Sequence, residues 1–335
     1  MASGAQVAAT PRGVAARRRR RAVTRDHLTA LLLLAPSVVA IAIFVYGFIG
    51  WTGFVSLTRW RGVLPDFTFV GLENYASILA TGRFQTNLRN VVVFTALFLV
   101  GCLGTGLVLA LLVDARVKGE ALFRSLFLFP MALSFIVTGV AWSWLFTPGN
   151  WPSDPTGLNL LFHRLGLDAL QGAWITDPTV VPGVRPDWSR TKLGVPLAMV
   201  PVVVAAVWQL SGFTMAMYLA GLRGISDEIR EAARVDGATG WRLFRDVTWP
   251  LLRPVTLSAV IVLGHISLKI FDLVLTMTGG GPGNATEVPG IFMYEIAFKA
   301  NKFAEGAAAA VVMLVMVSAL IVPYVLATLR GERDR

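Results

Sequence analysis

Six apolar runs limit the folds that this chain of 335 residues can adopt. At a rise of about 1.5 Å per residue, each run is long enough to cross the roughly 30 Å of hydrocarbon in a bilayer as a helix. The runs extend from Leu28 to Leu57, Val91 to Val113, Leu122 to Phe146, Val195 to Leu219, Val255 to Met277 and Ala304 to Leu329. Because lipid offers no partner to an open backbone, the sequence predicts an all-α integral membrane protein with six transmembrane helices. A hydrophobic content of 55% with only 15% charged residues agrees with this class.

The distribution of positive charge predicts which segments face the cytoplasm. Most of the 30 lysines and arginines lie in alternate segments between the runs: before Leu28, from Asp114 to Arg124, from Leu222 to Pro254 and after Leu329. Positive residues favour the cytoplasmic side, so both termini and the central segment are expected there. Residues 1–27, with an unbroken arginine run, are predicted to be a disordered basic N-terminus attracted to anionic membrane lipid. The net charge of +10 therefore reflects topology, and nucleic acid is not an expected partner.

Several classes of chemistry are excluded by what the sequence lacks. Cys102 is the only cysteine, so neither a disulfide framework nor a cysteine metal site is expected. His163 is the only histidine of the long segment between the third and fourth runs, which gives no metal site there. The sequence contains no Gly-Lys dipeptide and hence no P-loop for nucleotide phosphates. We therefore expect neither an enzyme nor a cofactor-binding chain.

The segment from Leu222 to Pro254 carries acidic and basic residues between two apolar runs, so it belongs in water. Ser226 is a suitable N-cap, and the two acidic residues after it suit the first turn of a helix. Gly237 is expected to end that helix. A second short helix should follow, closed by Pro250 and Pro254. The sequence predicts a helix-turn-helix that packs against another surface.

This segment also fits a family pattern: Glu-Ala-Ala, three residues, Gly, nine residues, Ile, any residue, Leu-Pro. Val247 and Trp249 stand where the pattern has Ile and Leu. The segment resembles the EAA loop of permeases in binding-protein-dependent ABC importers. The resemblance implies a coupling helix that sits in a groove of a cytoplasmic ATPase subunit. The residues that it assigns to this contact are Glu231, Ala232, Ala233, Asp236, Gly237 and Pro250.

Two further stretches resemble sugar permeases of this family, and the second is similar to the larger permease subunit of maltose importers. The stretches comprise Gly71, Leu72, Asn74, Tyr75 and Asn90, and then Phe271, Asp272 and the run from Thr278 to Pro282. The resemblance implies that residues 28–335 form the permease domain of a sugar importer in the cytoplasmic membrane of a prokaryote. It also implies a second permease subunit, an extracytoplasmic solute-binding protein, and cytoplasmic ATP-binding subunits that hold ATP and magnesium.

The fifth run offers candidates for a substrate pathway. His265, Lys269, Asp272 and Thr276 are spaced by four, three and four residues, so one continuous helix would place them on one face. Ionisable groups at membrane depth normally face a bundle interior or a wet cavity. Two alternatives remain: Lys269 and Asp272 can pair with each other as neighbours on the helix, or the stripe can serve an ion-coupled secondary transporter.

The fourth run carries aromatic and hydrogen-bonding side chains that suit a sugar, and that also suit ordinary helix packing. The candidates are Trp208, Gln209 and Phe213. In the second run, small residues are expected to allow close helix packing. They are Gly101, Gly104, Thr105, Gly106 and Ala110. Pro130 is expected to bend the third helix.

The longest segment outside the runs, residues 147–194, is expected on the external side. A short amphipathic helix is predicted around its apolar residues. These residues are Leu158, Leu161, Phe162 and Leu165. Two interpretations remain open: a surface for a solute-binding protein, or an interfacial cap with tryptophans at the level of the lipid headgroups.

Overall fold

The computed structural model describes residues 28–115 and 119–333, which divide into two units between Phe54 and Val55. The predicted disorder of residues 1–27 lies outside the described residues. The first unit is dominated by a helix that runs from Leu28 to Ser56 and includes the π-helical segment η1 (Ala42–Gly47) and α2 (Phe48–Ser56). Its leucines, isoleucines, valines and phenylalanines are largely exposed, as expected of a helix in lipid.

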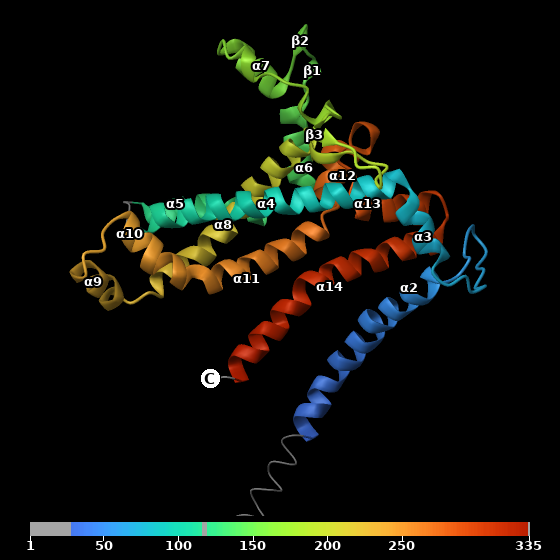
Figure 1. The fold of residues 1–335 in the computed structure, drawn as a ribbon, viewed down its shortest axis with the longest axis horizontal. Coiled ribbons are helices and arrows are strands. Elements are labelled where there is room, and N and C mark those ends of the chain that lie inside the picture. Colours follow the sequence, from blue (N-terminus) through green and yellow to red (C-terminus); the bar gives the residue numbers. More distant parts are fainter. Residues whose placement is uncertain (1–27, 116–118, 334–335) are drawn as a thin grey trace, which may run out of the picture. The chain divides into compact units, whose positions relative to one another are not determined.

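The second unit is built around long helices, drawn together in Figure 1. They are α4 (Gly82–Asp114), α8 (Met199–Arg223), α11 (Trp249–Leu268) and α14 (Phe303–Arg333). Among the described residues, five helices of the chain are long and apolar enough to cross a membrane, and a bent pair adds a sixth if it counts as one span. The predicted all-α membrane fold is confirmed.

The bent pair corresponds to the third apolar run. It consists of α5 (Glu120–Leu128), the 3-10 turn η2 (Phe129–Ala132) and α6 (Phe135–Phe146), with a bend of 97°. Pro130 stands at the start of η2, and the backbone of Leu133 and Ser134 is extended. The Ser134 side chain then accepts a hydrogen bond from the amide of Ile136 and starts α6. The bend expected at Pro130 is confirmed.

Close packing of α4 on α8 forms the centre of the second unit. Gly101 faces Val207, and Gly106 faces Thr214, with no room for a Cβ atom at either glycine. Ala110 is buried too, but Gly104 and Thr105 are exposed. Both residues instead line an apolar cavity beside α8, and an added Cβ atom at Gly104 would meet no atom within 4 Å, so the close packing expected of them is not formed within the described residues. The main core includes Phe94, Phe98, Cys102, Met199, Val202, Ala206, Leu263, Leu273 and Val274.

The chain that follows the first span is held by Asn74 in the short helix α3 (Glu73–Ala80). The buried Asn74 amide donates hydrogen bonds to the carbonyl oxygens of Ser56 and Thr58, at 2.9 and 2.7 Å. The hydroxyl groups of Ser56 and Tyr75 lie 2.6 Å apart. Asn74 and Tyr75, which carry part of the sugar-permease resemblance, thus have a structural role here.

Residues 147–194 form a small folded segment. Two short hairpins, β1 (Gly149–Asn150) with β2 (Asp154–Pro155) and β3 (Val180–Val184) with β4 (Leu193–Pro196), flank the helix α7 (Gly157–Arg164). The predicted amphipathic helix is confirmed in α7. Buried Asn159 connects α7 to the chain after it, because its Oδ1 atom accepts hydrogen bonds from the Gly172 amide and the Trp174 indole.

The fifth run is not one helix. α11 ends at Leu268, and α12 (Asp272–Thr278) begins after a break at residues 269–271. The break lets Ile270 be buried while Lys269 and Asp272 stay exposed. The chain continues through η6 (Pro282–Asn284), α13 (Pro289–Tyr294) and the π-helical segment η7 (Glu295–Lys299) to α14.

Candidate functional site

The helix α9 (Asp227–Val235) lies beyond the end of α4 that carries Asp114 (Figure 1). The β3–β4 hairpin lies at the other end, where the Thr191 and Thr86 hydroxyls are 2.9 Å apart. The structure therefore places α9 and the folded segment at opposite ends of α4. This is the arrangement expected if one of them faces each side of a membrane.

Local sequence explains both ends of α9. Ser226 has the extended backbone of an N-cap, although its side chain forms no cap hydrogen bond within the described residues. Gly237 adopts a φ of +85°, which favours glycine, and its amide donates to the carbonyl of Arg234. The amide of Ala238 donates to the Ala233 carbonyl at 2.9 Å. The predicted end of the helix at Gly237 is confirmed.

Most of the surface of α9 is open. The side chains of Glu231, Ala232 and Asp236 are exposed, and Ala233 is half-buried. Apolar residues are exposed on the same segment: Val235 is 86% exposed, and Trp241 of the following turn is 71% exposed. A surface that combines small, acidic and apolar residues is suited to contact with another protein.

The predicted end of the second helix, at Pro250 and Pro254, is wrong. α10 (Trp241–Leu243) and the π-helical segment η5 (Phe244–Thr248) continue directly into α11. Pro250 lies in the first turn of α11 and Pro254 lies inside it. Because the preceding helical segment runs into α11 without a gap, Pro250 lies within a continuous helix rather than at a free helix start. The wider π-helical turn just before Pro250 relaxes the strict α-helical register.

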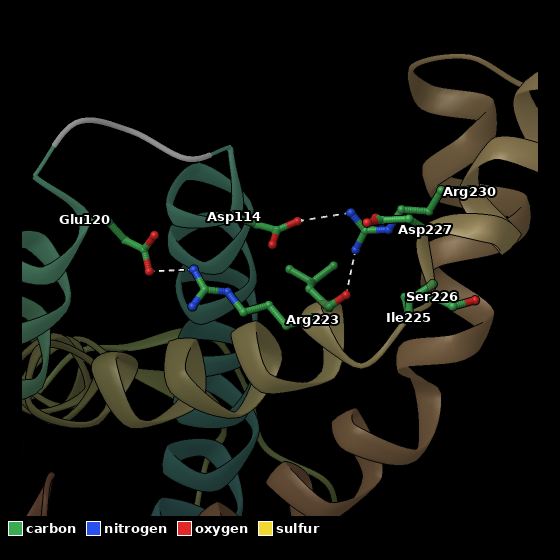
Figure 2. A pocket seen from close by; sticks show the side chains of 8 residues that line it. Asp114, Glu120, Arg223, Ile225, Ser226, Asp227 and Arg230 are labelled. Carbon is green, nitrogen blue, oxygen red and sulfur yellow. Dashed lines mark hydrogen bonds and ion pairs between the residues drawn. The ribbon is translucent and has the colours of Figure 1, made fainter.

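The base of α9 is joined to the bundle by a cluster of charged groups (Figure 2). Arg230 donates to the Leu222 carbonyl at 2.6 Å and contacts the Asp114 carboxylate at 3.4 Å. Arg223 and Glu120 form a second ion pair at 2.5 Å. A cavity of about 540 Å³ opens between these groups. Its lining includes Asp114, Glu120, Arg223, Ile225, Ser226, Asp227 and Arg230.

The candidate pathway residues of the fifth run do not share one helix face. His265 belongs to α11, Lys269 to the break, and Asp272 and Thr276 to α12. The expected single stripe is wrong, because the break changes the direction of the chain. Thr276 donates to the Asp272 carbonyl at 2.7 Å and packs against Gly139 of α6.

The expected alternative, a pair between Lys269 and Asp272, is not formed. Both residues are exposed, and within the part of the chain that the structure describes no ion pair joins them. The Nδ1 atom of His265 is buried without a hydrogen-bond partner among the described residues. Within the same ranges, no group of three or more His, Cys, Asp or Glu residues could hold a metal ion.

The three candidates of the fourth run have different surroundings. Trp208 is partly exposed and lines an apolar cavity of about 1070 Å³, together with Trp142 of α6. Gln209 is buried and donates to the carbonyl of Leu133 at 2.8 Å, where the third span bends. Phe213 packs against the main core.

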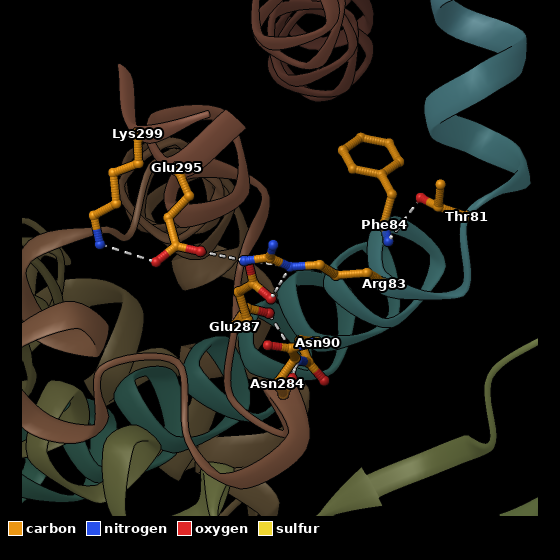
Figure 3. A network of polar contacts seen from close by, with 8 residues as sticks. All are labelled: Thr81, Arg83, Phe84, Asn90, Asn284, Glu287, Glu295 and Lys299. Carbon is orange, nitrogen blue, oxygen red and sulfur yellow. Dashed lines mark hydrogen bonds and ion pairs between the residues drawn. The ribbon is translucent and has the colours of Figure 1, made fainter. Parts of the chain in front are cut away.

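A buried ion-pair network that the sequence interpretation missed lies at the start of α4 (Figure 3). Arg83 donates to both carboxylate oxygens of Glu287 and also contacts Glu295. The Arg83 guanidinium holds the pKa of Glu295 below its usual value. The Asn90 amide donates to the carbonyls of Asn284 and Glu287 at 3.1 and 2.7 Å. In the sequence, the one indication of this network was Glu287, an acidic residue that directly follows the glycine-rich turn.

A family model and the sequences of known proteins agree on one family. The family model described as binding-protein-dependent transport system inner membrane component matches residues 102–330. A probable ABC transporter permease protein of Pyrococcus horikoshii is 40% identical over 302 residues, which cover 90% of this chain and 96% of that protein. The xylose/arabinose import permease protein XacH of Haloferax volcanii is 34% identical over 288 residues, covering 85% and 83%.

The fold also matches a solved structure. A chain of a bacterial ABC transporter involved in the import of the acidic polysaccharide alginate has a TM-score of 0.69 and 19% sequence identity. The match covers 90% of this chain and 96% of that chain. At this identity the likeness concerns the fold.

Proposed function

The chain belongs to the inner membrane components of binding-protein-dependent transport systems, and on this basis we propose that it imports a sugar with energy from a separate ATPase subunit docked on α9. It is a multi-pass ABC importer permease, a transport component rather than an enzyme. The observation that carries the coupling proposal is α9 itself. It is a well-defined helix with a largely open surface at one end of the bundle.

The residues of the family pattern support this docking site. Glu231, Ala232 and Asp236 are exposed on α9, and small side chains allow close approach of a second helical surface. Gly237, at a φ of +85°, forms the turn that ends α9. Pro250 is half-buried in the first turn of α11, so its role is to shape the connection rather than to contact the ATPase.

A carbohydrate substrate is supported by two observations. One relative is named as a xylose/arabinose import permease. Trp142 and Trp208 line the same cavity, with ring centroids 5.6 Å apart. Aromatic faces suit the C–H surfaces of a sugar ring.

The partners follow from the same proposal. A second permease subunit completes the pathway, cytoplasmic ATPase subunits bind ATP and magnesium, and a solute-binding protein delivers the sugar outside. The folded segment with exposed Trp188 is the proposed contact for the solute-binding protein. Both termini are placed in the cytoplasm with α9, in accord with the arginine-rich N-terminus. Closure of the ATPase subunits then moves α9 and switches the translocation pathway between its outward-facing and inward-facing states.

We predict that Glu231→Lys and Gly237→Val abolish most ATP-driven uptake while membrane insertion is unchanged. The first reverses a charge on the docking surface, and the second places a β-branched residue at a φ of +85°. Uptake is measured in proteoliposomes with labelled xylose, arabinose or maltose, whichever the wild-type complex transports. Matched controls outside the proposed contacts are Glu73→Lys, an exposed charge on α3, and Gly62→Val, at a φ of +86° in open space. Normal uptake by both α9 variants would refute the docking site.

The break in the fifth span is the proposed polar part of the translocation path, with Lys269 and Asp272 at its centre. Their exposure without mutual pairing favours a role toward substrate or solvent. We expect Asp272→Asn to reduce uptake in an assembled complex, and the exchange of Lys269 and Asp272 to give no rescue. Glu73→Gln, at an exposed carboxylate on α3, is the control. Full activity with both residues changed to alanine would move the path toward Trp208 or the second permease subunit.

A further inference from the structure

Arg230 connects α9 to two membrane helices at once. Its Nη2 atom donates to the carbonyl of Leu222, near the end of α8, at 2.6 Å. Its Nη1 atom lies 3.4 Å from the Oδ2 atom of Asp114, the last residue of α4. Figure 2 shows the two ends of one guanidinium group directed at these two helices. One side chain therefore spans the ends of α4 and α8.

The surroundings of Arg230 favour a firm connection. The side chains of Arg230 and Asp114 are only 22% and 21% exposed, so water screens this pair less than a surface pair. The guanidinium also lies at the C-terminus of α8, where the helix dipole favours a positive group. The neighbouring pair of Arg223 and Glu120 ties the end of α8 to the start of α5.

Other side chains of α9 make no comparable connection. Within residues 28–115 and 119–333, Arg230 is the one side chain of α9 that forms a hydrogen bond or ion pair with the membrane helices. The remaining acidic and basic side chains of α9 are exposed. Apart from side-chain packing and the backbone at each end of α9, a force applied to α9 therefore enters the bundle through this arginine.

The two helices that Arg230 contacts also share the most extensive contact of any two elements in the described part of the chain. The contacts of Gly101 with Val207 and of Gly106 with Thr214 leave no space for a Cβ atom. Close-packed helices move together rather than slide freely. A displacement of Arg230 therefore reaches the core cluster that α4 and α8 share.

We propose that Arg230 is the positioning residue that transmits the movement of α9 to α4 and α8. The proposal rests on the proposed docking of an ATPase subunit on α9, and it adds the path by which that contact acts on the membrane helices. The Leu222 carbonyl and the Asp114 carboxylate are the two receiving groups. A group that only stabilised the fold would affect assembly and all activities alike.

The test uses the complete complex in proteoliposomes, with ATP hydrolysis and uptake of labelled xylose, arabinose or maltose measured on the same samples. Arg230→Met keeps the apolar stem and removes both contacts. We expect the ATPase subunit to stay bound and active, and uptake per ATP to fall about tenfold or more, because each of the two lost charge-assisted hydrogen bonds corresponds to roughly a factor of ten. Arg230→Lys can donate to the Leu222 carbonyl without bridging to Asp114. Its uptake per ATP hydrolysed should therefore lie between that of Arg230→Met and that of the wild type.

Arg253→Met is the matched control, because Arg253 is exposed on α11 at the same end of the bundle. Its ratio of uptake to hydrolysis should equal that of the wild type. An unchanged ratio in Arg230→Met, or uptake and hydrolysis that fall in the same proportion, would overturn the proposal. If Arg230→Met does not assemble, the same ratio of uptake to hydrolysis is measured for Asp114→Asn and Arg230→Lys. A wild-type ratio in both of these variants would overturn the Arg230 proposal.

Failure of the docking proposal gives a different result. In that case the ATPase subunit does not co-purify with the wild type, or Glu231→Lys keeps full uptake. Failure of the Arg230 proposal alone leaves ATPase binding and the Glu231→Lys defect intact.

Discussion

Arg83→Met is expected to destabilise the protein by about 3 to 5 kcal/mol, because it leaves a buried carboxylate without its counter-charge. The Glu287 side chain is 1% exposed and accepts hydrogen bonds from Arg83 at 2.9 and 2.7 Å. A positive group in the first turn of α4 is unfavourable for the helix dipole, so the acidic partners explain its presence there. Methionine preserves much of the apolar stem, which limits the effect to the lost charge.

Glu287→Gln should lower the free energy of unfolding by less than Arg83→Met does. In Glu287→Gln, Arg83 is 34% exposed and keeps Glu295 as a partner, whereas in Arg83→Met no other cation of the described residues pairs with Glu287. Lys299→Met is the control, because Lys299 is 58% exposed and an exposed pair contributes at most about 1 kcal/mol. Thermal unfolding in detergent measures all three variants. A loss for Arg83→Met no larger than for Lys299→Met would contradict the buried-pair account.

The pH of that measurement matters because of Glu295. Its pKa is lowered from 4.5 by the hydrogen bond from Arg83. A carboxylate with a lowered folded-state pKa adds stability above its unfolded value, and this contribution is lost as the pH falls through the folded-state value. Near neutral pH the contribution is fully present, so the variants are compared there.

Gly212→Ala is expected to destabilise the contact between α8 and the end of α5 by about 1 to 3 kcal/mol or more. A Cβ atom at Gly212 would lie 1.9 Å from the carbonyl oxygen of Phe127 and 2.6 Å from its carbon. Both are backbone atoms, so no side chain can rotate away. This strain outweighs the gain of about 1 kcal/mol that alanine brings to a helix.

Gly104→Ala is the matched control for Gly212→Ala. Gly104 lies in α4 with no atom within 4 Å of an added Cβ, so helix propensity alone should act and stability should rise slightly. Thermal unfolding of the two variants in the same detergent gives the comparison. Equal effects of the two substitutions would show that the close approach at Phe127 carries no energetic weight.

Local patterns in the sequence predicted most of the helices and the form of α9. Long apolar runs set the membrane spans, and Gly237 set the end of α9. Pro130 indicated the bend of the third span, since proline removes a backbone donor. Pro250 and Pro254 misled for the same reason, because both prolines are accommodated within the helix of residues 241–268.

Contacts between distant residues were not predictable from spacing. Arg83 and Glu287 are 204 positions apart, and only the fold shows that they meet. The break at residues 269–271 was missed because its residues continue an apolar run with helical periodicity. Gly104 and Gly106 look alike in the sequence, yet only Gly106 packs directly against a side chain of α8, whereas Gly104 lines a cavity beside that helix.

The contact between α9 and a separate ATPase subunit is tested most directly by cross-linking. In a Cys102→Ser background, which removes the single cysteine, Ala232→Cys places a photoactivatable thiol reagent on α9, and Trp188→Cys places it on the folded segment, where Trp188 is 78% exposed. We predict an adduct with the ATPase subunit from position 232 and none from position 188. No ATPase adduct from position 232 in an assembled, ATP-hydrolysing complex, or equal adducts from both positions, would contradict the account.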